Sequence, residues 1–242
     1  MARPRAANYD DQRDRILHQA AELFALHGYG GTSMNEVAQA CGVSKAALYH
    51  YVRDKSELLM LIALTHVGRL EHLTAEVLSQ PLPAEERMRL LILRFVDEYA
   101  GARHEHRVLT EDVKFLESQE QRQVLAAQRR VVNAFAAVVR ELRPELADAG
   151  LHKALTMLLF GMINWMFTWL RPDGTISHGH MGEMVVALFF GGIQAIRAQP
   201  SAAEGSTRSP SVRKGTGSGS GAPRKSLGSA RRSAPAVKAG VS

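Results

Sequence analysis

The chain has 242 residues, 45% of them hydrophobic, and a formal net charge of +6. This length allows one or two domains with a sizeable core. The charge is unevenly spread, because residues 199–242 hold eight Lys or Arg and one acid and sum to +7, which leaves −1 for residues 1–198. Net charge therefore gives no reason to expect that residues 1–198 bind nucleic acid. Only local motifs can support that function.

The single cysteine, Cys41, excludes an internal disulfide and favours a reducing compartment. We expect Cys41 to be a small, buried, apolar side chain. The N-terminal residues are polar and basic and lack the apolar region of a secretory signal. The sequence therefore predicts a cytoplasmic protein.

Apolar residues recur at helical spacing after residue 10, and no segment alternates as a strand does, so the sequence predicts an all-α fold. Residues 1–9 are interpreted as a short arm. For its Arg3 and Arg5, contact with a DNA minor groove and a solvated terminus are both open. The first helix is expected from about Asp10 to His27, ended by Gly28.

The next segment predicts a helix-turn-helix. Ser33 and Glu36 have the spacing of a capping box, which opens a short helix. Gly42 permits the tight turn that follows, and Ser44 can cap the second helix. Two short helices at a sharp angle fit a DNA major groove, so residues 10–56 are predicted to be a DNA-binding domain.

A second domain for ligand binding and dimerisation is expected at residues 57–198. Asp54 and Glu57 form another capping-box sequence, which opens a long helix that ends near Leu78. Further helices are expected at Glu85–Ala102, Val108–Phe115, Gln119–Leu142, Leu151–Leu170 and His180–Arg197, with a turn at 171–174. Residues 199–242 lack aromatic residues, are rich in Ser, Gly and basic residues, and are predicted to be a disordered basic tail.

The helix-turn-helix and its flanks resemble the DNA-binding domain of TetR-type repressors over about residues 10–60. The agreeing residues are Ala20, Leu23, Phe24, Gly28, Tyr29, Thr32, Ser33, Val37, Ala38, Gly42, Val43, Ser44, Leu48, Tyr49, Lys55 and Leu58. Val52 departs, because an aromatic residue is common there, and we expect this to change local packing. The resemblance implies a homodimer that binds a palindromic operator in double-stranded DNA and responds to a small-molecule effector.

The DNA contacts are expected on the exposed side of the second helix. Lys45 can donate to guanine, and Ala46 can contact a thymine methyl group. The resemblance assigns phosphate contacts to Tyr49 and Lys55. The predicted DNA-binding set is Thr32, Ser33, Ser44, Lys45, Ala46, Tyr49, His50, Tyr51 and Lys55. A core position for Tyr51 is an equally good alternative.

Two apolar segments lie near the end of the second domain. Residues 154–170 have no charged residue, a length close to the lower limit for a membrane span. Residues 184–196 are also uncharged but shorter, so a buried helical layer is favoured and no membrane partner is predicted. Helices that are apolar all round must be covered on two sides. We therefore expect this pair to form a symmetric four-helix interface between two copies.

This region resembles the ligand domains of TetR-type regulators of fatty-acid, steroid and related acyl-CoA catabolism. The agreeing residues are Phe160, Gly161, Met162, Asn164, Trp165, Trp169, Arg171, Pro172 and Gly174, with Leu109, Glu111, Asp112, Gln128 and Arg129. The resemblance implies an acyl-CoA effector. The predicted ligand-binding set is His66, Arg69, Phe95, Tyr99, Phe160, Asn164, Trp165, Thr168 and Trp169.

Physical arguments support part of that set. Trp165, Trp169 and Phe160, with Phe167, can line an apolar slot, although core positions are an equal alternative. Asn164 and Thr168 are polar groups in an apolar helix, so each needs a hydrogen-bond partner. Three arginines, Arg129, Arg130 and Arg140, can meet CoA phosphates or belong to a solvated helix face.

Two histidine clusters suggest other chemistry. His104-Glu105-His106 and His178-Gly179-His180 lack the spacing of a zinc signature, so no metal and no cofactor is predicted. A metal-dependent enzyme is the weaker alternative. A non-specific architectural DNA-binding protein that uses the basic tail is another, although it leaves the second domain without a purpose. The favoured prediction is a transcriptional regulator and not an enzyme, a repressor that its effector releases from DNA.

Overall fold

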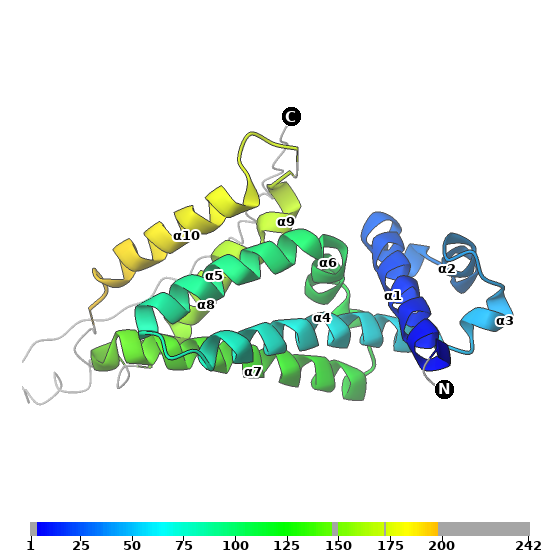
Figure 1. Ribbon diagram of the computed structural model, residues 1–242, viewed down its shortest axis with the longest axis horizontal. Coiled ribbons are helices and arrows are strands. Elements are labelled where there is room, and N and C mark those ends of the chain that lie inside the picture. Colours follow the sequence, from blue (N-terminus) through cyan, green and yellow to red (C-terminus); the bar gives the residue numbers. More distant parts are fainter. Residues whose placement is uncertain (1–3, 147–149, 172, 198–242) are drawn as a thin grey trace, which may run out of the picture. The chain divides into compact units, whose positions relative to one another are not determined.

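The computed structural model describes residues 4–146, 150–171 and 173–197, with side chains from Tyr9 onward. This part of the chain contains α-helices and short 3-10 turns and no strand (Figure 1), as predicted. The helices are α1 (Pro4–Gly31), α2 (Met34–Ala40), α3 (Lys45–Leu48), α4 (Lys55–Leu78), α5 (Ala84–Gly101), α6 (Arg103–Glu111), α7 (Ser118–Leu142), α8 (Leu151–Asn164), α9 (Met166–Trp169) and α10 (His178–Ile193). The predicted tail, 199–242, and Arg3 lie outside the described residues.

The first helix begins earlier than predicted, at Pro4, inside the segment interpreted as an arm. The predicted stop at Gly28 is confirmed, because its backbone is non-helical, with φ 77°, a conformation that glycine adopts without steric cost. A short helical turn follows this kink and completes α1 at Gly31.

The caps of the helix-turn-helix confirm the local prediction. The Ser33 N–H donates to the Glu36 carboxylate at 2.6 Å, and the Glu36 N–H donates to the Ser33 hydroxyl oxygen at 3.3 Å. Gly42 turns the chain with φ 65°. The Ser44 hydroxyl oxygen accepts from the Ala47 N–H at 3.1 Å and opens α3, which is only four residues long.

α4 connects the helix-turn-helix to the rest of the described chain (Figure 1). Its first turn is capped by Asp54, whose carboxylate accepts from the Glu57 N–H at 2.8 Å. The Glu57 carboxylate accepts from Arg53 and not from Asp54, so the reciprocal bond of the capping box is displaced by one residue. α4 packs against α1, α5, α6 and α7. The buried residues of α4 belong to the same hydrophobic core as those of the helix-turn-helix and of the helices that follow.

Three predicted helices have different bounds. The helix expected at 108–115 is replaced by α6 and a 3-10 turn at Val113–Phe115. The segment expected to be one helix over 151–170 is divided at Trp165 into α8 and α9. The last helix begins at His178 behind a Ser177 cap and ends at Ile193. Apolar periodicity alone does not locate such breaks, because both sides of each break remain buried.

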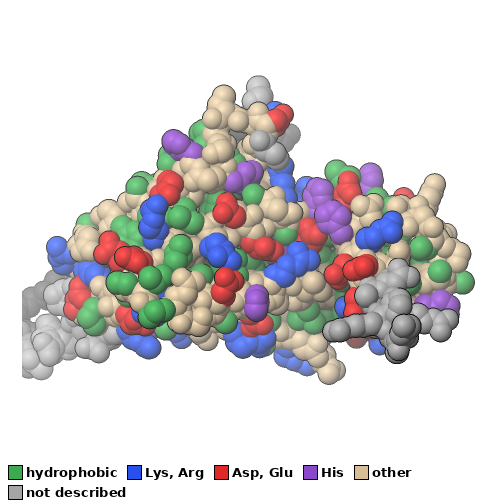
Figure 2. All heavy atoms as spheres, viewed as in Figure 1, with side chains coloured by type: hydrophobic (Ala, Val, Ile, Leu, Met, Phe, Trp, Pro, Cys, Tyr) green, Lys and Arg blue, Asp and Glu red, His purple; other side chains and the backbone are tan. Residues whose placement is uncertain are grey.

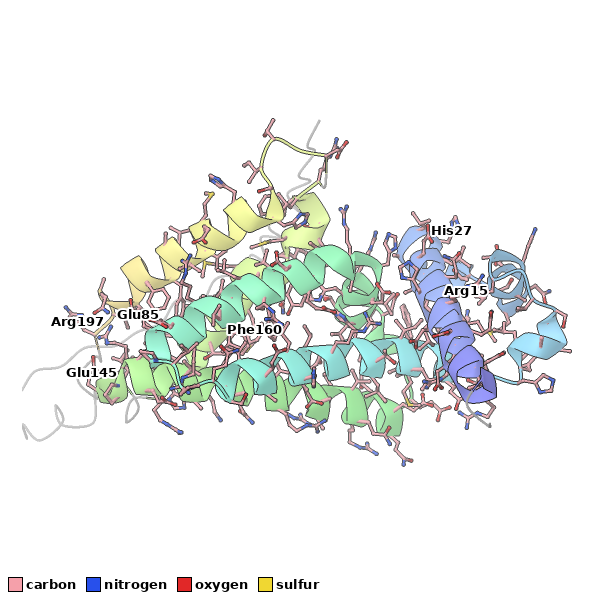
Figure 3. The ribbon with its side chains drawn as sticks, viewed as in Figure 1. Arg15, His27, Glu85, Glu145, Phe160 and Arg197 are labelled. Carbon is pink, nitrogen blue, oxygen red and sulfur yellow. The ribbon has the colours of Figure 1, made fainter. Side chains whose placement is uncertain are left out.

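The aromatic core lies between α5, α7 and α8. The ring centroids of Phe95 and Phe135 are 4.8 Å apart, and those of Phe135 and Phe160 are 4.9 Å apart. Figure 3 shows Phe160 in the region between the α4 and α5 ribbons. On the face in Figure 2, acidic and basic side chains are interspersed. No helix of the described part is long and apolar enough to cross a membrane.

Candidate DNA-binding face and ligand cavity

α3 presents an exposed polar face on one buried anchor. Leu48 is fully buried, whereas the other side of α3 and the following turn are exposed. The predicted contact residues on this exposed face are Ser44, Lys45, Ala46, Tyr49 and His50. This arrangement leaves side chains that can donate to bases and phosphates free to meet a groove.

Two residues predicted to contact DNA are instead bonded inside the protein. The Thr32 hydroxyl is buried and donates to the carbonyls of Leu23 and Gly28 at 3.2 and 3.1 Å. The Lys55 ammonium donates to the carbonyls of Tyr29 and Thr32 at 2.9 and 3.0 Å. Both side chains hold the end of α1 against its neighbours, and a phosphate contact by Lys55 stays a prediction.

The remaining two predicted contacts differ in exposure. Ser33 is exposed, although its side chain already caps α2. Tyr51 is half-buried and stacks on Tyr9 of α1, with ring centroids 4.7 Å apart. The structure therefore supports the alternative in which Tyr51 packs inside the protein, because Tyr9 is its partner.

Hydrogen bonds join the DNA-binding helices to the helices behind them. The His18 imidazole of α1 lies 2.8 Å from the Glu105 carboxylate of α6. The Ser56 hydroxyl of α4 donates to the Glu120 carboxylate of α7 at 2.8 Å. A change in α4 or α6 can therefore reach the helix-turn-helix through direct contacts.

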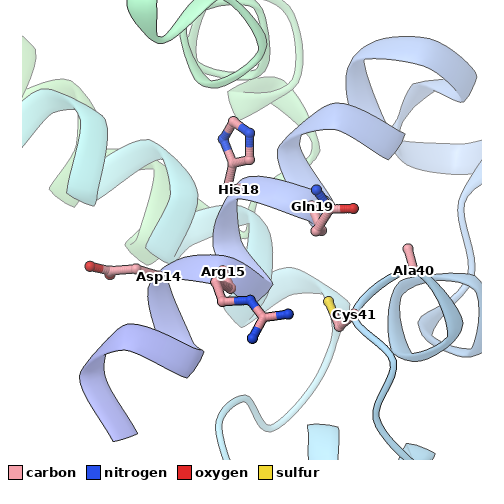
Figure 4. Close-up of a pocket in the computed structure, with 6 residues that line it drawn as sticks. All are labelled: Asp14, Arg15, His18, Gln19, Ala40 and Cys41. Atoms are coloured by element: carbon pink, nitrogen blue, oxygen red, sulfur yellow. The ribbon is translucent and has the colours of Figure 1, made fainter. Parts of the chain in front are cut away.

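A small cavity lies beside this junction, between α1 and the end of α2 (Figure 4). Its volume is about 320 Å³, and its lining residues are Asp14, Arg15, His18, Gln19, Ala40 and Cys41. Burial raises the pKa of the Cys41 thiol, which favours its protonated form. This is the small, unreactive role that the sequence predicted for Cys41.

A second cavity, of about 190 Å³, lies in the second domain. Its wall is built by α4, α6, α7 and α8, and its residues are Val67, Leu70, Leu109, Gln128, Val131, Val132, Met157, Phe160 and Asn164. The amides of Asn164 and Gln128 are the polar side chains in this wall. Such a lining is typical of a small-molecule site, in which a few polar groups orient an apolar ligand.

Phe160 and Asn164 are the only predicted ligand residues in this wall. His66 and Arg69 do not line it, because α4 turns the residues that directly follow them, Val67 and Leu70, towards the cavity. His66 is fully buried beside His106. Arg69 is exposed, and its guanidinium lies 3.8 Å from the Glu98 carboxylate.

Trp165 and Trp169 do not line this cavity. Their side chains are 56% and 53% exposed, which excludes the core alternative, and the apolar slot stays a prediction. Trp165 continues the exposed face of α8, because Gly161 and Leu158, one and two turns before it, are also exposed. Thr168 is also exposed, and its hydroxyl donates to the Trp165 carbonyl at 2.7 Å.

A buried polar network supports Asn164 from behind. The Tyr99 hydroxyl donates to Asn164 Oδ1 at 2.9 Å, and His106 Nε2 lies 3.1 Å from the Asn164 carbonyl oxygen. The rings of Tyr99 and His106 stack with centroids 3.7 Å apart. His66 Nε2 lies 3.3 Å from His106 Nδ1. Tyr99, predicted to bind ligand, therefore acts here through Asn164, while Phe95 packs in the aromatic core.

Both histidines of the network are neutral at physiological pH. Burial lowers the pKa of His66 to about 3 and that of His106 to about 4. Burial also raises the pKa of the Tyr99 hydroxyl, which therefore remains a donor.

Sequence reasoning missed the α7 side of the cavity and the role of His106. Gln128 was among the residues of the second resemblance, but nothing in the helical pattern separated it from solvated neighbours. His106 stood in a suspected metal cluster. In the described ranges, no group of three or more His, Cys, Asp or Glu side chains is placed to hold a metal ion.

Comparison with known proteins identifies the family. A family model described as bacterial regulatory proteins, tetR family, matches residues 16–61, and one described as tetracyclin repressor-like, C-terminal domain, matches residues 81–193. A TetR-family transcriptional regulator from Bordetella parapertussis 12822 is 34% identical, with a TM-score of 0.70 over 77% of this chain and 98% of that one. The chain belongs to the TetR family.

Two further proteins are similar to this chain over most of its length. FasR of Mycolicibacterium smegmatis, a transcriptional activator, is 26% identical over 77% of this chain and 85% of its own. The structure of AibR in complex with isovaleryl coenzyme A and operator DNA is 24% identical, with a TM-score of 0.64 over 73% of this chain and 97% of that one. The AibR likeness shows the fold. This chain covers only 47% of the length of another curated relative, from Bacillus subtilis.

Proposed function

We propose that this protein is a homodimeric TetR-type repressor that binds a palindromic operator and is released from it by an acyl-CoA. The observation that carries the proposal is the position of α4. Its first residues support the helix-turn-helix, and its middle residues, Val67 and Leu70, form part of the cavity wall. One helix therefore contacts both the DNA-binding end and the proposed effector site.

The acyl part of the effector suits the cavity. Most of its wall is aliphatic, with the Phe160 ring on one side. The structural neighbour AibR was crystallised with isovaleryl coenzyme A and operator DNA, which supports the same ligand class here. Arg129 and Arg140 on α7 are exposed and form no ion pair with other described residues, so they can meet CoA phosphates. Arg130 is less suitable, because its guanidinium pairs with Glu71.

The dimer is proposed from the outer faces of α8 and α10. Large apolar side chains are exposed there, namely Met157, Leu158, Met184 and Leu188. Exposed apolar side chains on two packed helices are typical of a protein interface. Two copies of this pair would cover each other as a four-helix layer.

Release follows from a shift in population. An acyl-CoA that prefers a tilted α4 favours a dimer whose two α3 helices no longer match adjacent major grooves, which are about 34–36 Å apart. A tenfold loss of operator affinity needs a preference of about 1.4 kcal/mol for the released state.

The test is a mobility shift of the full-length protein on its operator. The DNA is first selected from a random library, and acyl-CoAs with short, branched, aromatic and long acyl groups are then added. Release by an acyl-CoA, but not by CoA or the free acid, supports the proposal. If no member of the panel releases DNA or raises the melting temperature, the effector class is wrong, although selection of a palindrome would still support operator binding.

A further inference from the structure

The network behind Asn164 has a fixed direction. The Asn164 carbonyl can only accept a hydrogen bond, so His106 must donate to it through Nε2–H. A neutral imidazole with a proton on Nε2 has a lone pair on Nδ1, so His66 must donate to that atom through its own Nε2–H. Every donor of the two histidines is thereby committed, and the chain of bonds runs from His66 to Asn164.

The side-chain amide of Asn164 has a fixed orientation for the same reason. The buried Tyr99 hydroxyl has no other acceptor among the described residues, so it donates to Asn164 Oδ1. The opposite amide orientation would leave this buried hydroxyl without an acceptor, which is costly. The Asn164 oxygen therefore faces Tyr99, and the Nδ2 group is left without a partner in the described part of the chain.

Asn164 lines the 190 Å³ cavity, so this uncommitted N–H group is available there to a ligand. Gln128 is the other polar side chain of the wall, and its amide carries no comparable restraint in the described structure. The cavity volume is slightly greater than that of an engineered apolar cavity of about 150 Å³, which binds benzene. The cavity therefore suits a compact apolar group attached to a hydrogen-bond acceptor.

We infer that Asn164 selects the effector by donating to its acyl carbonyl, and that the acyl group is short, branched or a single ring. This inference rests on the proposed acyl-CoA function and narrows it. Tyr99 and His106 are positioning residues, because they hold the side chain and backbone of Asn164 without lining the cavity. A ligand of equal shape that lacks the carbonyl leaves the oriented donor unpaired, which costs binding.

The experiment compares thioesters with thioethers on the full-length protein. Isovaleryl-, hexanoyl- and benzoyl-CoA are matched with S-(3-methylbutyl)-, S-hexyl- and S-benzyl-CoA, which keep the apolar group and lack the carbonyl. Calorimetry gives the Kd values, and operator release gives the functional response. We expect the thioethers to bind roughly ten- to a hundredfold more weakly, as loss of a partner for an oriented donor predicts. Palmitoyl-CoA should also bind more weakly than the compact thioesters.

Three variants separate recognition from folding. Asn164→Asp retains an acceptor for Tyr99 but lacks the N–H donor, so it should lose the thioester preference. Tyr99→Phe frees the amide to rotate and should reduce the preference while the cavity lining stays unchanged. Asn133→Asp, the same substitution at an exposed position of α7 outside the cavity wall, should retain it. Operator affinity without ligand, measured for each variant, checks that the fold is intact.

The outcomes distinguish this inference from the function on which it rests. Equal Kd values for wild-type thioester and thioether, or an undiminished preference in Asn164→Asp, would overturn the role of Asn164. Tighter binding of palmitoyl-CoA than of every compact thioester would overturn the size limit. If none of the CoA compounds binds or releases the operator, the proposed effector class itself fails and takes the inference with it.

Discussion

The polar side chains of the α3 face are exposed on a helix that a local cap begins. Those behind the ligand cavity are buried and are hydrogen-bonded to residues from other helices. Lys45 follows the Ser44 cap directly, and its neighbours in sequence are also its neighbours in space. Asn164, by contrast, depends on Tyr99, 65 positions away, and on His106, 58 positions away. The first arrangement suits a surface that must meet solvent-exposed DNA, and the second suits a site that must orient one group before a ligand arrives.

The largest expected difference between the two regions is in pH dependence. His66 and His106 have folded-state pKa values of about 3 and 4, below the ordinary 6.5. As pH falls through 6.5, the unfolded chain binds protons that the folded chain does not. Stability contributed by the neutral histidines is therefore full above pH 6.5 and decreases towards pH 4, by up to about 1.4 kcal/mol per pH unit for each histidine.

Denaturant unfolding between pH 7 and pH 5 measures this slope. A His66→Gln and His106→Gln double variant should flatten it, whereas His27→Gln, at an exposed position of α1, should leave it unchanged. An unaltered slope in the double variant would show that these histidines are not the source.

The next largest effect concerns the DNA-binding end alone. Lys45→Ala should weaken operator binding by about 1–3 kcal/mol and relax preference at one base pair, because we predict that its exposed ammonium donates to a guanine. Arg140→Ala removes the same charge from an exposed position near the end of α7 and serves as the matched control. Equal operator affinity and equal sequence preference for Lys45→Ala and wild type would remove Lys45 from the base-reading set.

A smaller effect tests the internal role found for Thr32. Thr32→Val removes a buried hydroxyl that donates to Leu23 and Gly28, and we expect a loss of roughly 1 kcal/mol in the free energy of unfolding. The same substitution at the exposed Thr168 should cost less. If the two substitutions have equal effects on unfolding, burial does not distinguish these hydroxyls.

The smallest effect is expected from Tyr49→Phe. Loss of the predicted phosphate contact should weaken binding by roughly 0.5–1.5 kcal/mol, to the same extent on operator and non-operator DNA, because phosphates carry no sequence information. Competition assays on both DNAs measure this. A loss confined to the operator would make Tyr49 a base-reading residue.

The sequence by itself determined the helix-turn-helix, because its signals are local. Ser33, Gly42 and Ser44 act on backbone groups within a few residues, so their spacing alone predicts a cap, a turn and a cap. The all-α fold, the ends of α4 and α7 to within a residue, and the exposed face of α3 follow from the same local rules. Asn164 was recognised as a polar group that needs a partner, but the sequence could not name that partner.

Only the tertiary structure decided how the ligand domain uses its residues. Apolar residues continue through Trp165, yet α8 ends there, and both tryptophans are exposed. The helical pattern of α4 did not distinguish His66 from Val67 as the cavity residue, since both are buried and only the packed neighbours differ. Orientation of Asn164 required Tyr99 and His106 from two other helices, because a buried hydrogen bond depends on distance in space and not on distance along the chain.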